Sequence, residues 1–372
     1  MSETTGAGAG APRDAAGDLG PARVAALDGE GQFGAVAGLS RQLDDGYRAA
    51  RTALAGWRPF EGGRPDGVVV CGMGGSAIGA DVIGACLGGL PAPYQVVRGY
   101  GLPGWVTRRT LVAAVSYSGD TEEALSCVDD ALARGVRPLC VASGGRLDAV
   151  ATERGLTLVR VPGGLRPRAA LGYLATPLAA ALEAAGLLDG FADQVGEAVE
   201  VAGRLAVELG PESPDDSPAK RLARELAGRL PLVYGGGVTA PAARRWKGQL
   251  NENAETPAFF NEVPELDHNE LAGWVANREL GGRAFLVLLD DPAGDERLRR
   301  RFDLTATMLG PLVAGVARVE ARGTSLFARV VSSLYVGDFV SLYLALLYGV
   351  DPGPITALEE LKRRLAAAGP TP

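Results

Sequence analysis

Histidine is nearly missing from this sequence, because the 372 residues include only one, His268. Zinc sites that rely on several imidazole ligands are therefore excluded, since no second histidine exists to share the ion. Positive charge is not in excess either, with 37 lysines and arginines against 44 aspartates and glutamates. The net charge of −7 argues against binding to nucleic acid, which depends on surplus positive charge to neutralise phosphates. We expect neither a bound metal nor a nucleic-acid partner.

Cysteine is scarce, and the four cysteines form no Cys-x-x-Cys motif. All lie in or beside apolar segments, at positions Cys71, Cys86, Cys127 and Cys140. Such cysteines are typical of buried, reduced thiols in a cytoplasmic protein. The sequence gives no indication of a redox or catalytic thiol.

Long hydrophobic runs are also lacking. The longest, at about residues 339–350, is interrupted by Ser341 and is too short to cross a bilayer. The first ten residues are mostly small and polar, without the basic and apolar segments of a signal peptide. These features predict a cytoplasmic protein without membrane contact.

The composition is that of a globular protein, with 47% apolar and 22% charged residues. At roughly 150 residues per domain, the length favours two domains. A tail rich in Gly, Ala and Pro (1–20) is expected to be disordered. A linker rich in Pro and Asp (210–218) is expected to separate a first domain with leading helices (21–209) from a second domain (219–372).

Short apolar segments alternate with helical patterns in both halves of the chain. After a helical segment, the predicted strands of the first half cover residues 68–71, 94–97, 111–115, 138–141 and 156–161. Those of the second half cover residues 231–234, 284–289 and 316–320. Helices are predicted over about residues 21–57, 168–209, 219–228, 240–253, 295–309, 325–348 and 355–368. Strands this uniformly apolar are typical of a parallel sheet covered on both faces. The pattern predicts an α/β fold with two doubly wound parallel sheets and flanking helices.

The first predicted strand runs into a glycine-rich turn that ends in a serine and opens a helix, with the sequence Gly72-Met73-Gly74-Gly75-Ser76-Ala77-Ile78-Gly79. Such a turn can bind an anion, because the free N–H groups and the dipole of the helix start point at the ligand. A Walker A loop is excluded because the turn has no lysine. The dinucleotide pattern G-x-G-x-x-G/A is formally matched, but Arg98 stands where that fold wants an acidic residue. A tight turn without any ligand is the third interpretation.

A second polar turn follows the predicted strand at 111–115, with the sequence Ser116-Tyr117-Ser118-Gly119-Asp120-Thr121-Glu122-Glu123. A helix is expected to begin at Asp120. In a parallel sheet both turns lie at the carboxyl edge, where ligands bind. Two hydroxyl-rich helix starts without a lysine suit a phosphate ester better than a nucleoside triphosphate. Capping of the helix by Ser118 or Asp120, without a ligand, is the alternative.

These two motifs together resemble the sugar isomerase (SIS) domain superfamily, whose members bind phosphosugars. The second half is more specific and resembles the bifunctional phosphoglucose/phosphomannose isomerase family. The segments that carry this resemblance are 245–253, 257–261, 264–270 and the closing 351–362. The resemblance covers about residues 21–368 and implies two SIS-type subdomains. One departure is Asp120, where the family usually has asparagine, which adds a negative charge beside the expected phosphate site.

The resemblance implies a metal-independent, cofactor-free aldose–ketose isomerase that interconverts glucose 6-phosphate or mannose 6-phosphate with fructose 6-phosphate. By the same resemblance, Glu252 is the base that moves the proton, while His268 and Lys362 assist ring opening. Arg168 matches the arginine near the enediolate, with Arg166 as the competing candidate. The expected phosphate ligands are Gly75, Ser76, Ser116, Ser118 and Thr121. A homodimer is implied, whose active site takes His268 from the same subunit or from its partner.

These residues suit the chemistry of the reaction. Ring opening requires an acid and a base, proton transfer between C2 and C1 requires one base, and a cation stabilises the enediolate. Without the resemblance, Glu252 would be interpreted as a solvated carboxylate, His268 as a structural residue and Lys362 as a surface lysine. The alternative function is a regulatory module that binds a phosphosugar without turnover, which would suit a chain lacking the glutamate or the histidine. An amidotransferase-coupled synthase is not expected, because it needs an N-terminal cysteine.

Overall fold

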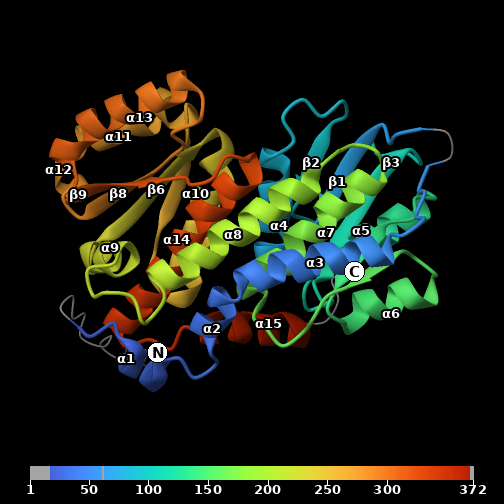
Figure 1. Cartoon of the computed structure of the whole chain (residues 1–372), viewed down its shortest axis with the longest axis horizontal. Coiled ribbons are helices and arrows are strands. Elements are labelled where there is room, and N and C mark those ends of the chain that lie inside the picture. Colours follow the sequence, from blue (N-terminus) through green and yellow to red (C-terminus); the bar gives the residue numbers. More distant parts are fainter. Residues whose placement is uncertain (1–16, 61–62, 369–372) are drawn as a thin grey trace, which may run out of the picture.

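A computed structural model describes residues 17–60 and 63–368, in which two parallel β-sheets are flanked by helices (Figure 1). The first sheet has the strand order β2-β1-β3-β4-β5, and every neighbouring pair is parallel. Its strands are β1 (Gly67–Cys71), β2 (Tyr94–Val97), β3 (Thr110–Val115), β4 (Leu139–Ala142) and β5 (Leu158–Arg160). All five predicted strands of the first half are confirmed. The two central strands, β1 and β3, are buried throughout, as their uniformly apolar sequences require.

The second sheet has the strand order β7-β6-β8-β9 and is also parallel throughout. Its strands are β6 (Leu230–Gly236), β7 (Phe259–Val263), β8 (Ala284–Asp290) and β9 (Gly315–Glu320). Three of these strands were predicted, whereas β7 was not. The predicted α/β class with two doubly wound parallel sheets is therefore confirmed.

The leading segment, predicted as helical over about residues 21–57, forms the three helices α1 (Pro21–Leu27), α2 (Gln32–Ala37) and α3 (Leu39–Ala53). The strands of the first sheet are connected through α4 (Gly74–Ala85), α5 (Glu122–Ala133) and α6 (Gly145–Glu153). The predicted helical stretch 168–209 is divided into a 3₁₀ turn and two helices, η1 (Pro167–Ala169), α7 (Leu171–Ala184) and α8 (Phe191–Leu209). Of the tail predicted as disordered, only residues 17–20 lie within the described part of the chain.

The second half is built in the same way. Around its sheet lie α9 (Pro218–Leu226), η2 (Gly237–Thr239), α10 (Ala240–Asn253), η3 (Glu265–His268), α11 (Glu270–Ala276), α12 (Arg278–Gly281), α13 (Glu296–Leu309) and η4 (Gly310–Leu312). The chain then continues through α14 (Leu326–Tyr348) into α15 (Thr356–Ala368). The five predicted helices of this half are present, and η3, α11 and α12 were not predicted.

Helix α14 is the central element of the core. Its 23 residues are long and apolar enough to cross a membrane, but the helix is completely buried inside the protein. It packs against α8 and α4 of the first half and against α9 and α10 of the second. The apolar run at 339–350 is thus mostly the second half of a buried core helix.

Two details support this packing. A Cβ atom at Gly337 of α14 would lie 2.3 Å from the buried ring of Trp246, so glycine allows α10 to approach closely. The segment predicted as a linker is held in place by the ammonium group of Lys220, which donates to the carbonyl oxygens of Pro211 (2.9 Å) and Ser213 (2.7 Å). All four cysteines are free and buried, as predicted.

Candidate active site

The two polar turns predicted as an anion site meet at the carboxyl edge of the first sheet. One follows β1 and the other follows β3, and these strands are hydrogen-bonded neighbours. The backbone N–H of Tyr117 donates to Oγ of Ser76 at 3.4 Å, which joins the two turns directly. The two turns lie far apart in the sequence, and the parallel pairing of β1 with β3 brings them together.

Hydroxyl groups line the second turn. Oγ of Ser116 lies 2.8 Å from Oγ1 of Thr121 and accepts the backbone N–H of Gly119 at 3.1 Å. Ser116 is fully buried, whereas Ser118 is exposed. Helix α5 begins at Glu122, two residues later than expected. The start of α5 and the start of α4 therefore both lie beside these hydroxyl groups.

Glycine at position 75 allows a third segment to reach the turn. A Cβ atom at Gly75 would lie 2.7 Å from the carbonyl oxygen of Pro167 and 3.4 Å from the Cα atom of Arg168. Any other side chain would push η1 away from the start of α4. The close approach carries Arg168 to the edge of the predicted phosphate site.

Arg168 is held from several sides. Its Nε donates to Oδ1 of Asn253 at 2.6 Å, and its Nη2 donates to the carbonyl oxygens of Pro352 and of Gly353, the latter at 2.7 Å. Nη1 lies 3.9 Å from Oε2 of Glu252. The guanidinium group is buried, and its orientation is fixed by groups other than Glu252. Arg166, the competing candidate, instead pairs with Glu30 on the surface.

Glu252 lies in the last turn of α10, with one third of its side chain exposed. Burial raises the pKa of the Glu252 carboxyl above its ordinary value. Positive charges nearby oppose this effect, namely those of Arg168, Arg245, Lys247 and Lys362. A carboxyl group in such an environment is suited to accept and return a proton.

A buried polar network lies behind Arg168 and Glu252. Both carboxylate oxygens of Asp338 accept hydrogen bonds from Arg245, from Nε and from Nη2, each at 2.8 Å. The same Nη2 donates to the carbonyl oxygen of Arg168 at 2.8 Å. Oγ of Ser341 accepts the amide of Asn253 at 2.9 Å. The network fixes η1 and the end of α10 to the core helix α14.

This network was not predicted as part of the site. A signal for it was present, because Asp338 is the only acidic residue in the mostly apolar segment 326–348. A charge in a buried helix requires a partner, and that partner is Arg245 in the most specific segment of the second half.

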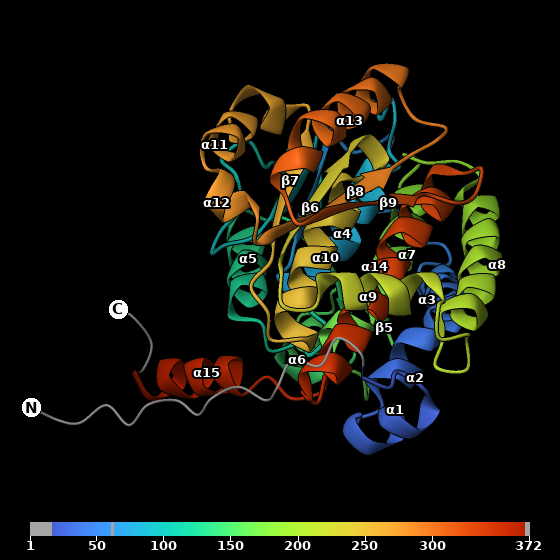
Figure 2. The ribbon, with the colours of Figure 1, turned by 90° about the vertical axis from the view of Figure 1, so that its left-hand side faces the viewer.

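Lys362 lies on α15, which extends from the body of the protein in Figure 2. Its side chain is exposed, and its charge acts on the Glu252 carboxyl. The start of α15 is tied to η1 by an ion pair between Glu359 and Arg166, with 3.5 Å between Oε1 and Nη1. The structure therefore places Lys362 on the same side of the molecule as Glu252.

His268 lies elsewhere. It ends η3, which follows β7 at the carboxyl edge of the second sheet. Helix α10 starts at that edge and runs away from it for 14 residues, about 20 Å, before it reaches the turn of Glu252. Figures 1 and 2 show α11, which begins two residues after His268, far from α15. Within one chain, His268 and Glu252 are not brought together.

Asp120, the departure from the family pattern, has a local partner. Its Oδ1 accepts the backbone N–H of Arg146 at 3.0 Å, in the first turn of α6. The positive end of the α6 dipole therefore faces the added negative charge. Arg98, which counted against dinucleotide binding, forms an ion pair with Asp81.

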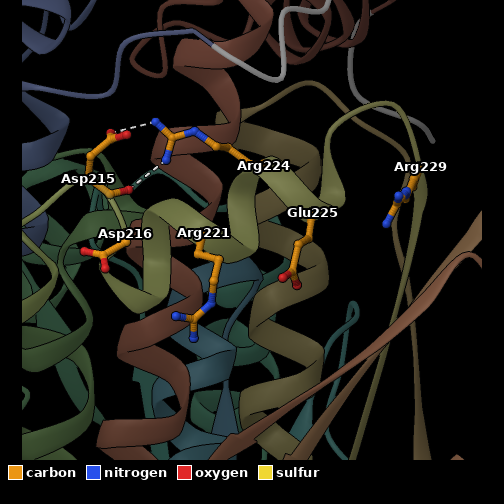
Figure 3. A pocket seen from close by; sticks show the side chains of 6 residues that line it. All are labelled: Asp215, Asp216, Arg221, Arg224, Glu225 and Arg229. Carbon is orange, nitrogen blue, oxygen red and sulfur yellow. Dashed lines mark hydrogen bonds and ion pairs between the residues drawn. The ribbon is translucent and has the colours of Figure 1, made fainter.

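A hollow on the surface contains none of these residues (Figure 3). It is lined by Asp215, Asp216, Arg221, Arg224, Glu225 and Arg229. Arg224 is already paired, since its Nη2 lies 2.6 Å from Oδ1 of Asp215. The equal numbers of acidic and basic side chains favour neither an anion nor a cation. Across residues 17–60 and 63–368, no cluster of three or more potential metal ligands occurs.

Comparison with known proteins agrees with these features. Residues 215–365 match the family described as bacterial phospho-glucose isomerase C-terminal SIS domain. The bifunctional phosphoglucose/phosphomannose isomerase of Caldicellulosiruptor bescii is 39% identical over 337 residues, covering 90% of this chain and 98% of the relative. The enzyme of the same name from Aquifex aeolicus is 36% identical over 302 residues, covering 80% of this chain and 90% of the relative.

Solved structures support the fold. Hypothetical protein TT0462 from Thermus thermophilus superposes with a TM-score of 0.67 at 18% identity, covering 94% of this chain and 93% of that one. A glucose-6-phosphate isomerase like protein from the same organism superposes with a TM-score of 0.59 at 24% identity, covering 93% and 100%.

Proposed function

The chain belongs to the bifunctional phosphoglucose/phosphomannose isomerase family, and we propose that Glu252 is its catalytic base. The protein is an aldose–ketose isomerase that interconverts glucose 6-phosphate or mannose 6-phosphate with fructose 6-phosphate. The observation that carries the assignment of the base is the Glu252 carboxylate beside the fixed guanidinium group of Arg168, at 3.9 Å. This pair combines a proton acceptor with a cation at one point.

The phosphate group of the substrate binds at the two polar turns in this proposal. Hydroxyl groups of Ser76, Ser116, Ser118 and Thr121 donate hydrogen bonds to it, together with backbone N–H groups near Gly75. The starts of α4 and α5 direct the positive ends of their dipoles at the same place. Support comes from the contact between the turns and from the close approach of Pro167 to Gly75.

The proton transfer then follows from the position of Glu252. Its carboxylate removes the proton from C2 of the open-chain aldose, and the electron pair moves into an enediolate between C1 and C2. Arg168 stabilises the negative charge that develops on the oxygens. The hydroxyl proton passes from O2 to O1, and return of the abstracted proton to C1 then gives the ketose, so no electron donor or acceptor is needed. Deprotonation at C2 removes the difference between the two aldose epimers, which suits an enzyme that accepts both.

Ring opening requires further groups, for which His268 and Lys362 are the candidates. Lys362 lies on the side of Glu252, but His268 of the same chain does not. We therefore propose a homodimer in which His268 of the partner subunit completes the active site. The exposed position of the imidazole supports this arrangement. The proposed reaction requires no metal, cofactor, nucleic acid or membrane. A cytoplasmic location is part of the same proposal.

A coupled assay tests this function. Purified protein is incubated with glucose 6-phosphate or mannose 6-phosphate, and the formation of fructose 6-phosphate is measured with and without EDTA. We expect turnover of the hexose 6-phosphates that EDTA does not diminish. Binding of both sugars without turnover would favour the regulatory module instead. Activity that EDTA abolishes and zinc restores would contradict the proposed mechanism.

A further inference from the structure

We propose that Asp267 and Glu270 are positioning residues, which hold the turn that carries His268 in a single conformation. The turn comprises residues 264–270, between the end of β7 and the start of α11. The inference rests on the proposed role of His268 in ring opening. It adds a reason why an exposed imidazole can act on a substrate outside its own chain.

Asp267 fastens the turn to α13. Its Oδ2 lies 3.1 Å from Nη1 of Arg301, and its Oδ1 accepts the hydroxyl of Thr305 at 3.0 Å. The side chain of Asp267 is only 11% exposed. Two bonds from one helix therefore hold the carboxylate that directly precedes the histidine.

Glu270 fastens the other side of the turn to the second sheet. Its Oε1 accepts the indole N–H of Trp274 at 2.9 Å and the hydroxyl of Tyr234, and its Oε2 accepts the amide of Asn261. Tyr234 lies in β6 and is fully buried, and Asn261 lies in β7. A single carboxylate thus connects α11 with two neighbouring strands.

Other residues of the turn are also fixed, by hydrogen bonds within the turn and by burial. Asn269 donates from its amide to Oε1 of Glu265 at 2.8 Å and accepts the backbone N–H of Glu270 at 2.6 Å. Leu266 is buried beneath the turn. By contrast, His268 is exposed, and its imidazole forms no hydrogen bond or ion pair with any described residue.

The contrast between the bonded residues of the turn and the unbonded imidazole indicates that the turn positions His268. The turn is tied to α13, β6 and β7 around a histidine that contributes nothing to those ties. A backbone fixed in advance loses little freedom when the imidazole meets a substrate, which increases the fraction of productive encounters. A turn built only for stability would have no need to leave its histidine free.

The single histidine provides a direct measurement. In the full-length protein labelled with ¹³C at histidine Cε1, the only imidazole signal in the NMR spectrum is that of His268. We expect one sharp signal from the wild type. Asp267→Asn and Glu270→Gln should broaden or split it, while Asp295→Asn, which alters a separate contact on α13, should leave it unchanged.

Kinetics provide the second measurement. Asp267→Asn and Glu270→Gln should lower kcat/KM for cyclic glucose 6-phosphate by about tenfold or more, because misplaced catalytic groups act poorly. Turnover of 5-deoxyfructose 6-phosphate, which lacks the hydroxyl that closes the ring, should remain near that of the wild type. If Asp267→Asn does not fold, Thr305→Val is used in its place, because it removes the hydrogen bond from the Thr305 hydroxyl to Asp267.

The outcomes separate the two proposals. If His268→Ala itself keeps full activity on the cyclic substrate, the role of His268 in ring opening is wrong. If His268→Ala is impaired but the two carboxylate variants keep both the sharp signal and their activity, the positioning role is wrong. Equal loss on the cyclic and open-chain substrates would show a general structural defect and would also overturn it.

Discussion

Oε2 of Glu252 lies 3.9 Å from Nη1 of Arg168, a distance that allows attraction but exceeds that of a hydrogen bond. Arg168 directs its other N–H groups to Asn253 and to the carbonyl oxygens of Pro352 and Gly353. The carboxylate oxygens therefore stay available to a substrate, while the positive charge stays close. In the proposed mechanism this separation leaves the base uncommitted and the cation fixed.

Removal of the base should abolish turnover. Glu252→Gln keeps the shape of the side chain but cannot remove the proton from C2. We expect kcat to fall by about 10³-fold or more, near the upper range for loss of a general base. KM should change little, because the phosphate site is formed by other segments. Steady-state assays with both hexose 6-phosphates measure this.

The matched control is Glu255→Gln, which changes an exposed carboxylate three residues away. It should keep its kcat within about threefold, as expected for a residue without a catalytic role. A Glu252→Gln variant with the kcat of the wild type would show that the base lies elsewhere.

The activity should depend on pH through the same carboxyl group. Since burial raises the pKa of Glu252, the ionised base is lost on acidification at a higher pH than for an ordinary glutamate. The charge of Lys362 lowers that pKa, so Lys362→Gln should raise it further. The acid limb of the profile of kcat/KM against pH should therefore move to higher pH.

Arg364→Gln, on the same helix, provides the comparison, because Arg364 pairs with Glu360 and is not among the charges with the largest effect on the pKa of Glu252. An acid limb that moves equally in the two variants, or moves to lower pH in Lys362→Gln, would contradict the proposed effect of the Lys362 charge on the Glu252 carboxyl.

Loss of a hydroxyl group from the second turn should weaken substrate binding. Ser116→Ala or Thr121→Ala removes one member of the pair that lies 2.8 Å apart, and with it one hydrogen bond to the phosphate group. A hydrogen bond to a charged group contributes about 1.5–3 kcal/mol, so KM should rise by roughly 10- to 150-fold. If both variants bind glucose 6-phosphate as tightly as the wild type, the phosphate site is misplaced.

Asp120→Asn should strengthen binding. The change removes a negative charge near the phosphate group but keeps an oxygen that can accept the N–H of Arg146. The dipole of α6 already offsets part of the charge, so we expect KM to fall by only about two- to fivefold. The decrease should become smaller at high salt, which screens exposed charges. A rise in KM would show that the carboxylate contributes to binding.

Much of this fold could be predicted from the sequence, because most strands of the two sheets are short, largely apolar runs. The pairing of the two polar turns could also be foreseen, since turns after neighbouring parallel strands lie at one edge. The hydrogen bond from the backbone N–H of Tyr117 to Ser76 therefore joins the two turns as expected.

Strand β7 could not be predicted from the sequence. Without this strand, the sequence gives no sign that Glu252 and His268 lie at opposite edges of the second sheet. Its sequence, Phe259-Phe260-Asn261-Glu262-Val263, neither alternates nor stays apolar, and it is flanked by Pro257 and Pro264. Glu252 and His268 are only sixteen residues apart in the sequence, but β7 lies between them and carries His268 to the opposite edge of the sheet. Likewise, only tertiary packing connects Asp338 with Arg245 and Arg168.

The central position of α14 also has a consequence for how the chain matures on the ribosome. Synthesis proceeds at roughly 5–20 residues per second, and domains near the N-terminus generally fold first. Here α4 and α8 are made early, but the helix that covers their apolar faces comes from residues 326–348. The first half therefore waits with uncovered apolar surface until almost the entire protein has been translated. A nascent chain that stalls before this helix is made should be a substrate for chaperones and proteases.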